Sequence, residues 1–157
     1  MAAGNAGENS AGCEIMKTFI VFLAFAVVFA GFSVFTNDSD NYVRLQKYLK
    51  ALAEECASGG IWMLQYNEST GKYTVNATDA KKYAQFIAGK HFSASLYPLL
   101  KGDISVLNVE RSVNKKGNEC LSVIVQWKAH QNYRIMRLPF IPSPQIVTGG
   151  AIYEIRQ

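Results

Sequence analysis

An uncharged, strongly apolar stretch near the N-terminus dominates the pattern of the chain. Residues Thr18–Asn37 carry no charged side chain, and the segment from residue 18 to residue 35 reads TFIVFLAFAVVFAGFSVF. About 20 helical residues span roughly 30 Å, the thickness of the hydrocarbon core of a bilayer. The pattern predicts a transmembrane or assembly helix over residues 15–37, preceded by a polar leader over residues 1–14.

The apolar stretch has a composition that a lipid anchor alone does not require. It contains six of the nine phenylalanines, at steps of three or four residues, so a helix would place them on one drifting stripe. Smaller residues such as Ala24, Ala30 and Gly31 would let neighbouring backbones approach. We therefore expect membrane lipid and other protein helices, including copies of this chain, as partners. The predicted assembly residues on the stripe are Phe19, Phe22, Phe25, Phe29, Phe32 and Phe35.

Two fates of this segment are compatible with the sequence. The pair Met16-Lys17 before an apolar run is typical of a signal peptide, and Val28–Ala30 fits a cleavage site. However, the leader contains no basic residue before Lys17, and the apolar run is longer than a usual signal sequence. A retained single-pass anchor is therefore our main interpretation. The alternative is an exported soluble α+β binding module whose residues 1–30 act as a cleaved signal peptide.

A polar break follows the apolar stretch at Thr36–Asn41 and contains several residues that favour helix N-termini. A second helical pattern covers Leu45–Ala57, and Gly59-Gly60 is a strong signal for a helix C-terminus. The sequence thus predicts two helical segments that form one rod with a bend at the polar break.

The region after Gly60 alternates between strand and helix signals. Residues 61–66 and 72–75 read as the two strands of a hairpin around a polar turn. A second helix is predicted to start at a cap on Thr78 or Asp79 and to run to about His91.

The last third of the chain reads as β-structure. The strongest predicted strand is Leu121–Trp127, with Trp127 in or near the core. Weaker strands are predicted at residues 104–109, 133–138 and 146–155, the last with a bulge at Gly149-Gly150. The expected fold class is α+β: a long N-terminal hydrophobic helix plus a small C-terminal domain with an antiparallel sheet, over residues 38–157.

Charge and cysteine content narrow the candidate functions. The net charge of +4 is small and dispersed, so we expect no nucleic-acid partner. The sequence has no catalytic motif and no metal-ligand spacing, so we expect neither an enzyme nor a cofactor or metal. Cys56 and Cys120 have two open interpretations, a disulfide in an oxidising compartment or two buried thiols.

Glu14 stands at the edge of the apolar stretch, where a carboxylate complements the positive end of a helix. In an assembly of parallel helices, Glu14 could neutralise the terminal amine of a neighbour or a lysine such as Lys17.

The layout of the whole chain resembles that of type IV pilin-like proteins, closest to the TadE-like branch. The matching features, in order, are Gly7 or Gly12, Glu14, the apolar helix Ile15–Phe35, the continuation Leu45–Ala57, and strands around Leu121–Trp127 and Ile146–Ile155.

This resemblance implies a membrane-anchored structural subunit or assembly component of a surface filament or secretion apparatus. It also implies that the C-terminal domain faces away from the cytoplasm. The count of basic residues points the other way, because only Lys17 precedes the apolar stretch while Arg44, Lys47 and Lys50 follow it. We take the orientation implied by the resemblance as the expectation, with localisation in the cell membrane or in an extracellular filament.

Overall fold

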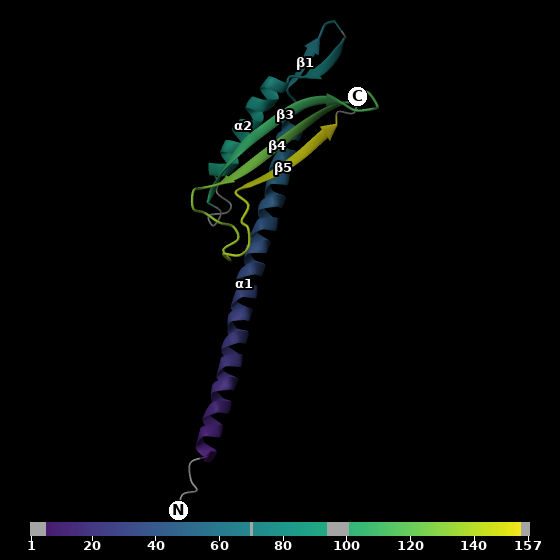
Figure 1. Cartoon of the computed structure of the whole chain (residues 1–157). Helices are drawn as coiled ribbons and strands as arrows, with labels where there is room; N and C mark the ends of the chain where they lie inside the picture. The colour runs from purple at the N-terminus through teal and green to yellow at the C-terminus, as the bar shows by residue number, and fades with distance from the viewer. Residues whose placement is uncertain (1–5, 70, 94–100, 155–157) are drawn as a thin grey trace, which may run out of the picture.

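One long helix and a small sheet domain make up the chain (Figure 1). The structure is a computed structural model and describes residues 6–69, 71–93 and 101–154. The predicted α+β fold class is confirmed. In chain order the elements are α1 (Ala6–Gly60), β1 (Leu64–Asn67), β2 (Lys72–Val75), α2 (Ala77–Ser93), β3 (Gly102–Val113), β4 (Glu119–Ala129) and β5 (Ile146–Glu154).

Helix α1 runs for 55 residues without interruption, which makes it roughly 80 Å long. The predicted break at residues 36–41 is therefore wrong. That segment contains no glycine or proline, and its carboxylates bond to other side chains instead of capping a new helix. Asp40 pairs with Arg44 one turn along the helix at 2.8 Å, and Asp38 binds Arg137. The predicted end at Gly59-Gly60 is confirmed.

The elements after α1 begin slightly away from their predicted positions. The amide of Ile61 donates to the carbonyl of Ala57 at 3.2 Å, so the chain first completes the end of α1 and β1 starts at Leu64. Asn76, and not Thr78 or Asp79, caps α2: its Oδ1 accepts the amides of both residues, at 3.1 and 3.3 Å. The predicted hairpin is confirmed as the antiparallel pair β1–β2.

The main sheet is antiparallel in the order β3-β4-β5. Its irregularity lies in β3, where Leu107 is the extra residue between Val106 and Asn108, and not at Gly149-Gly150 as predicted. Strand β5 pairs with β4 without a register shift from Ile146 to Glu154. Gly149 serves packing instead, because a Cβ there would lie 2.5 Å from the carbonyl carbon of Leu49 in α1.

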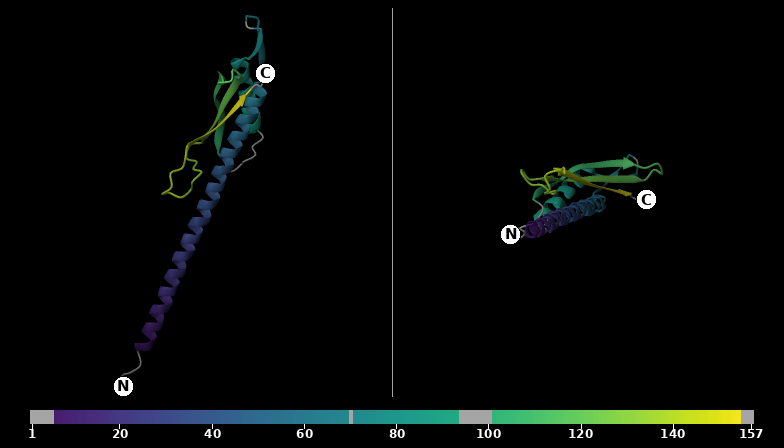
Figure 2. Two further views of the ribbon diagram at one scale, coloured as in Figure 1. Left: turned by 90° about the vertical axis from the view of Figure 1, so that its right-hand side faces the viewer. Right: turned by 60° about the horizontal axis from the view of Figure 1, so that its bottom comes forward.

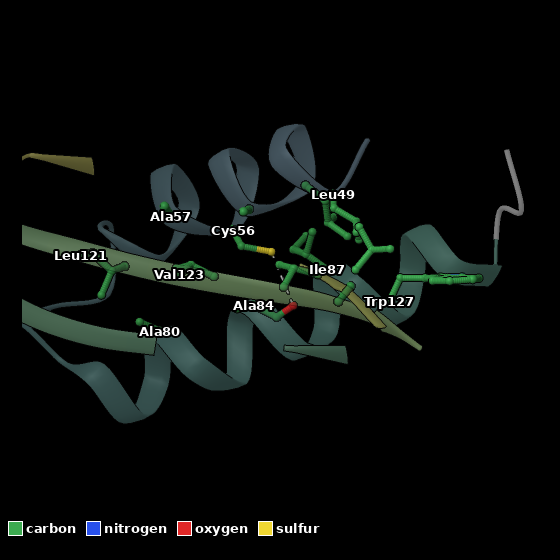
Figure 3. Close-up of a cluster of buried hydrophobic side chains, with 14 of the residues drawn as sticks. Leu49, Cys56, Ala57, Ala80, Ala84, Ile87, Leu121, Val123 and Trp127 are labelled. Atoms are coloured by element: carbon green, nitrogen blue, oxygen red, sulfur yellow. Dashed lines mark hydrogen bonds between the residues drawn. The ribbon is translucent and has the colours of Figure 1, made fainter. Parts of the chain in front are cut away.

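The C-terminal half of α1 and helix α2 pack on the same face of this sheet (Figures 1 and 2). Trp127 is only 2% exposed, which confirms its predicted place in the core. The buried residues come from both helices and from the sheet, and Figure 3 shows part of the cluster. The principal contributors are Leu45, Leu49, Leu52 and Cys56 of α1, Ala80, Ala84 and Ile87 of α2, and Leu121, Val123, Val125 and Trp127 of β4.

The strand predicted at residues 133–138 is wrong. Strand β4 already pairs with β3 on one side and β5 on the other, and the segment does not add to the outer edge of either of those strands. The backbone amides of the segment bond elsewhere: that of Arg137 donates to Asp38 Oδ2 at 2.8 Å, and that of Met136 to Ser143 Oγ at 3.2 Å. The segment is part of an irregular connection between β4 and β5.

Candidate membrane and assembly surface

The part of α1 from Glu14 to Asn37, which we call the stem, extends away from the sheet domain (Figures 1 and 2). Every residue of the stem is exposed except Gly31 and Val34, which are half-buried. The same helix enters the domain core at its other end, where Leu45 and Leu49 are buried. One continuous helix is thus both a core element and a free apolar rod.

The stem meets the length and composition of a membrane span. A helical segment, Glu14–Gly60, contains an 18-residue window with a mean hydropathy of 2.5, and none of that window is buried within the chain. The buried core helix of a soluble domain and an N-terminal signal sequence can reach the same length and hydropathy, and the exposure of the stem argues against the first of these. The stem is uncovered, so its apolar surface is available to lipid or to other helices.

All six predicted assembly phenylalanines lie on this free surface. Their exposed fractions run from 41% at Phe35 to 72% at Phe29. The structure brings the first two together with Glu14, Ile15 and Thr18 around a shallow hollow on the helix surface. The others continue along the rod towards the domain, so the stripe is a long ridge and not a compact patch.

Glu14 is exposed, as expected for a residue at the edge of the apolar stretch, but it does not lie in the first turn of the helix. Helix α1 already begins at Ala6, within the predicted polar leader. The field of a helix terminus fades within its first turn, so the predicted stabilisation of Glu14 by its own helix end is wrong. Its suggested contact with a neighbouring chain stays a prediction.

An ion pair between a buried carboxylate and a partly exposed arginine lies where the stem meets the domain. Asp38, directly after the stem, is 2% exposed and receives three bonds from Arg137. Nε and Nη2 of Arg137 lie 2.8 and 2.7 Å from Asp38 Oδ1, and its backbone amide donates to Oδ2. A buried carboxylate requires such compensation. The hydrogen bond that Arg137 donates to the carboxylate of Asp38 in turn raises the pKa of Arg137 above its ordinary value.

The connection between β4 and β5, residues 130–145, carries Arg137, and we call it the boundary loop. It is fixed to the domain by Ile135, which is 3% exposed, and by Tyr133, whose ring meets Trp127 edge-on at 6.2 Å. In its tip at residues 138–141, Leu138 and Ile141 are half-buried, whereas Phe140 is 78% exposed. The loop lies beside α1 on the stem side of the sheet (Figures 1 and 2).

The two candidate disulfide cysteines are both buried and free, so the disulfide interpretation is wrong in this structure. Strand β4 directs Leu121 towards the helices, and its neighbour Cys120 therefore lies on the opposite face of the sheet. Cys56 lies among the helices, where its thiol donates to the carbonyl of Ala84 at 3.7 Å (Figure 3). Burial, with a smaller contribution from Glu55, raises the pKa of Cys56 to about 11.

The buried carboxylate of Glu119 has a structural role in the domain. Glu119, which is buried, pairs with Arg111 and also accepts the amide of Val75 at 3.1 Å, so it joins the hairpin to the main sheet. Within the part of the chain that the structure describes, no group of three or more His, Cys, Asp or Glu side chains could hold a metal ion.

Sequence reasoning found the stem and its phenylalanines, and the prolines at 139, 142 and 144 predicted an extended linker before the last strand, but the Asp38–Arg137 contact was missed. The two partners are 99 positions apart in the sequence, so no local pattern indicated their contact. Comparison with protein-family models, with curated proteins and with solved structures gave no match for the chain.

Proposed function

We propose that this chain is a membrane-anchored, pilin-like structural subunit or assembly component, held in the membrane by its stem and presenting its sheet domain outside the cytoplasm. One observation carries the proposal: the apolar stem and the core-forming half of α1 are a single helix, of which the stem contacts no other part of the described chain extensively. A subunit that assembles through its helix needs this arrangement, because the position and orientation of the stem then set the position and orientation of the domain.

The free energy gained by removing the stem from water supports the proposal that lipid or other helices cover it permanently. Moving one phenylalanine side chain from water to an apolar environment contributes about 1.5–3 kcal/mol. The six exposed phenylalanines of the stem therefore represent on the order of 10 kcal/mol that the isolated chain leaves unused. Membrane lipid or a bundle of helices recovers this free energy.

Lateral assembly is supported by shape. Lipid tails are as apolar as any side chain, so helices associate in a membrane through close packing and not through hydrophobicity alone. The stem presents protruding rings such as Phe25 and Phe29 beside small residues such as Ala26 and Ala30, all exposed. This alternation of protruding rings and small side chains favours contact with other helices, including copies of the same stem.

The cleaved-signal alternative has one structural feature in its favour. The first buried side chain of α1 in the described residues is that of Asp38, so a chain that begins at Gly31 retains every buried residue of the domain. N-terminal sequencing of the mature protein with membrane fractionation decides between the two. An intact stem in the carbonate-washed membrane fraction supports the anchor, and a soluble chain beginning after Ala30 refutes it.

Assembly is tested by cross-linking in the membrane. Single cysteines are placed along the stem, for example at Ala24 and Ala30, in a Cys13→Ser background, since Cys56 and Cys120 are buried. We expect cross-links at a subset of positions with helical periodicity, and we expect them to weaken when all six phenylalanines become leucine. Uniformly absent cross-links, or undiminished ones in the all-leucine stem, would leave the segment as an anchor only.

A further inference from the structure

We propose that the tip of the boundary loop, residues 138–141, inserts into the headgroup layer of the membrane beside its own anchor, with Phe140 as the inserted side chain. This inference rests on the proposed anchoring of the stem. It adds a second point of membrane contact, which would fix the tilt and rotation of the domain on the bilayer.

The position of the loop along α1 places it at the required depth. Asp38 is the first residue after the charge-free stretch that ends at Asn37. Because the side chain and the backbone amide of Arg137 both bind Asp38, the residue preceding the tip is fixed at the end of the span. Figures 1 and 2 show the loop on the stem side of the sheet, next to α1.

The tip is built to hold one apolar side chain outward. Arg134 Nη2 donates to the carbonyl of Ile141 at 2.9 Å, and the amide of Ile141 donates to Leu138 at 3.2 Å, so the tip is a closed turn. Pro139 lies within this turn and restricts its backbone. Phe140 lies within this turn, and its side chain is 78% exposed.

The charge around the tip fits a lipid surface. Aromatic side chains next to arginines are the typical composition of a membrane interface, where rings insert and guanidinium groups meet phosphates. Arg137 uses part of its guanidinium group on Asp38, yet its side chain is still 58% exposed. Arg134 is exposed on the same loop. We favour lipid over a protein partner because the tip directly follows Arg137, which binds Asp38 at the end of the charge-free stretch.

The test measures depth with fluorescence. The full chain with Cys13→Ser receives one cysteine, at Phe140, at Val27 in the stem or at Lys116 in the β3–β4 turn far from the stem, and each is labelled with an environment-sensitive dye. Each protein is placed in nanodiscs of phosphatidylcholine and phosphatidylglycerol with spin-labelled lipid, the spin label at the headgroup or deep in the acyl chain. Cys56 and Cys120 are buried and resist labelling.

We expect the dye at position 140 to be quenched about twice as strongly by the headgroup label as by the deep label, since interfacial groups lie within about 5–10 Å of the headgroup boundary. The dye at position 27 should show the reverse order, and the dye at position 116 should show little quenching by either. Unquenched dye at position 140 with quenched dye at position 27 overturns the loop inference and leaves the anchor intact. Unquenched dye at position 27 overturns both the loop inference and the proposed membrane anchor.

A second pair of variants tests the role of the ion pair without altering the tip. Asp38→Asn removes the carboxylate that holds Arg137, while Asp40→Asn removes an exposed carboxylate two residues away that pairs only one turn along α1. Asp38→Asn should lower headgroup quenching at position 140, and Asp40→Asn should not. Equal quenching in both variants contradicts the inference, and so does a cross-link to a second copy through the unlabelled cysteine at position 140 when the labelled protein is quenched by neither lipid label.

Discussion

Gly149 offers a sharp test of how closely the long helix is joined to the sheet. A Cβ at this position would lie 2.5 Å from the carbonyl carbon of Leu49, and 2.7 Å from both Leu49 Cβ and the backbone nitrogen of Lys50. Real Cβ atoms do not approach backbone atoms this closely, so Gly149→Ala must move β5 or α1. Both are regular elements that pack along their length, and neither can yield at a single residue.

The magnitude follows from the cost of overpacking a well-packed core. Inserting one methyl group that displaces its surroundings costs about 1–3 kcal/mol. Alanine also restricts the unfolded chain more than glycine does, which offsets about 0.4–1 kcal/mol where the native site has room. We therefore expect Gly149→Ala to lower the free energy of unfolding by about 1–2 kcal/mol, or several degrees in Tm for a domain of this size.

Gly150→Ala is the matched control. The two glycines are adjacent in β5, but a Cβ at Gly150 meets nothing nearer than the Val123 carbonyl oxygen at 3.7 Å. This variant should be neutral or slightly stabilising. Thermal and denaturant unfolding of the full chain in detergent, followed by circular dichroism, compares the two. If both variants unfold within about 0.5 kcal/mol of the unsubstituted protein, α1 does not pack on β5 as described.

Three other predictions concern the stem, the core and the thiol. Val27→Arg places a charge in the middle of the stem at a cost of about 2.5–3.5 kcal/mol, so we expect less protein in the membrane fraction. Trp127→Ala should cost about 3–5 kcal/mol in the same unfolding assay, and a change of a degree or two would contradict its burial. Cys56 should resist alkylation at pH 8 until the chain unfolds. Because its pKa is about 11 in the folded state against 9.0 ordinarily, the unfolded state loses its proton first. The free energy of unfolding should therefore fall by about 1.4 kcal/mol per pH unit between these values, and Cys56→Ala should remove that dependence.

The sequence predicted most of what depends on local pattern. The apolar stem, the helix end at Gly60 and the strand at residues 121–127 each follow from a periodicity or a terminator within a few residues. The errors have a common cause in tertiary contacts. Residues 133–138 resemble a strand, but the backbone amides of Met136 and Arg137 donate to Ser143 and Asp38 and not to a neighbouring strand. Gly149-Gly150 resembles a bulge, but the helix approaches Gly149 and the strand stays regular.

For Asp38, the local sequence pattern can predict burial but not the binding partner. It lies seven residues before Leu45 and eleven before Leu49, so the helical period places it on the core-facing side of α1. A reader of the sequence could therefore have inferred that this carboxylate is buried and needs a cation. The identity of that cation could not be inferred, because Arg137 lies 99 residues away in a segment without regular structure.

The continuity of α1 through Asp38 also has a mechanical consequence. Two helices joined by a flexible break would let the domain swing freely on its anchor. Here the backbone is helical from the stem into the core, and the Asp38–Arg137 pair braces the junction from the side. Any rotation of the stem, whether imposed by lipid or by a neighbouring helix, is therefore carried directly to the sheet. Such coupling is what a subunit needs if packing among stems is to set the arrangement of the domains around them.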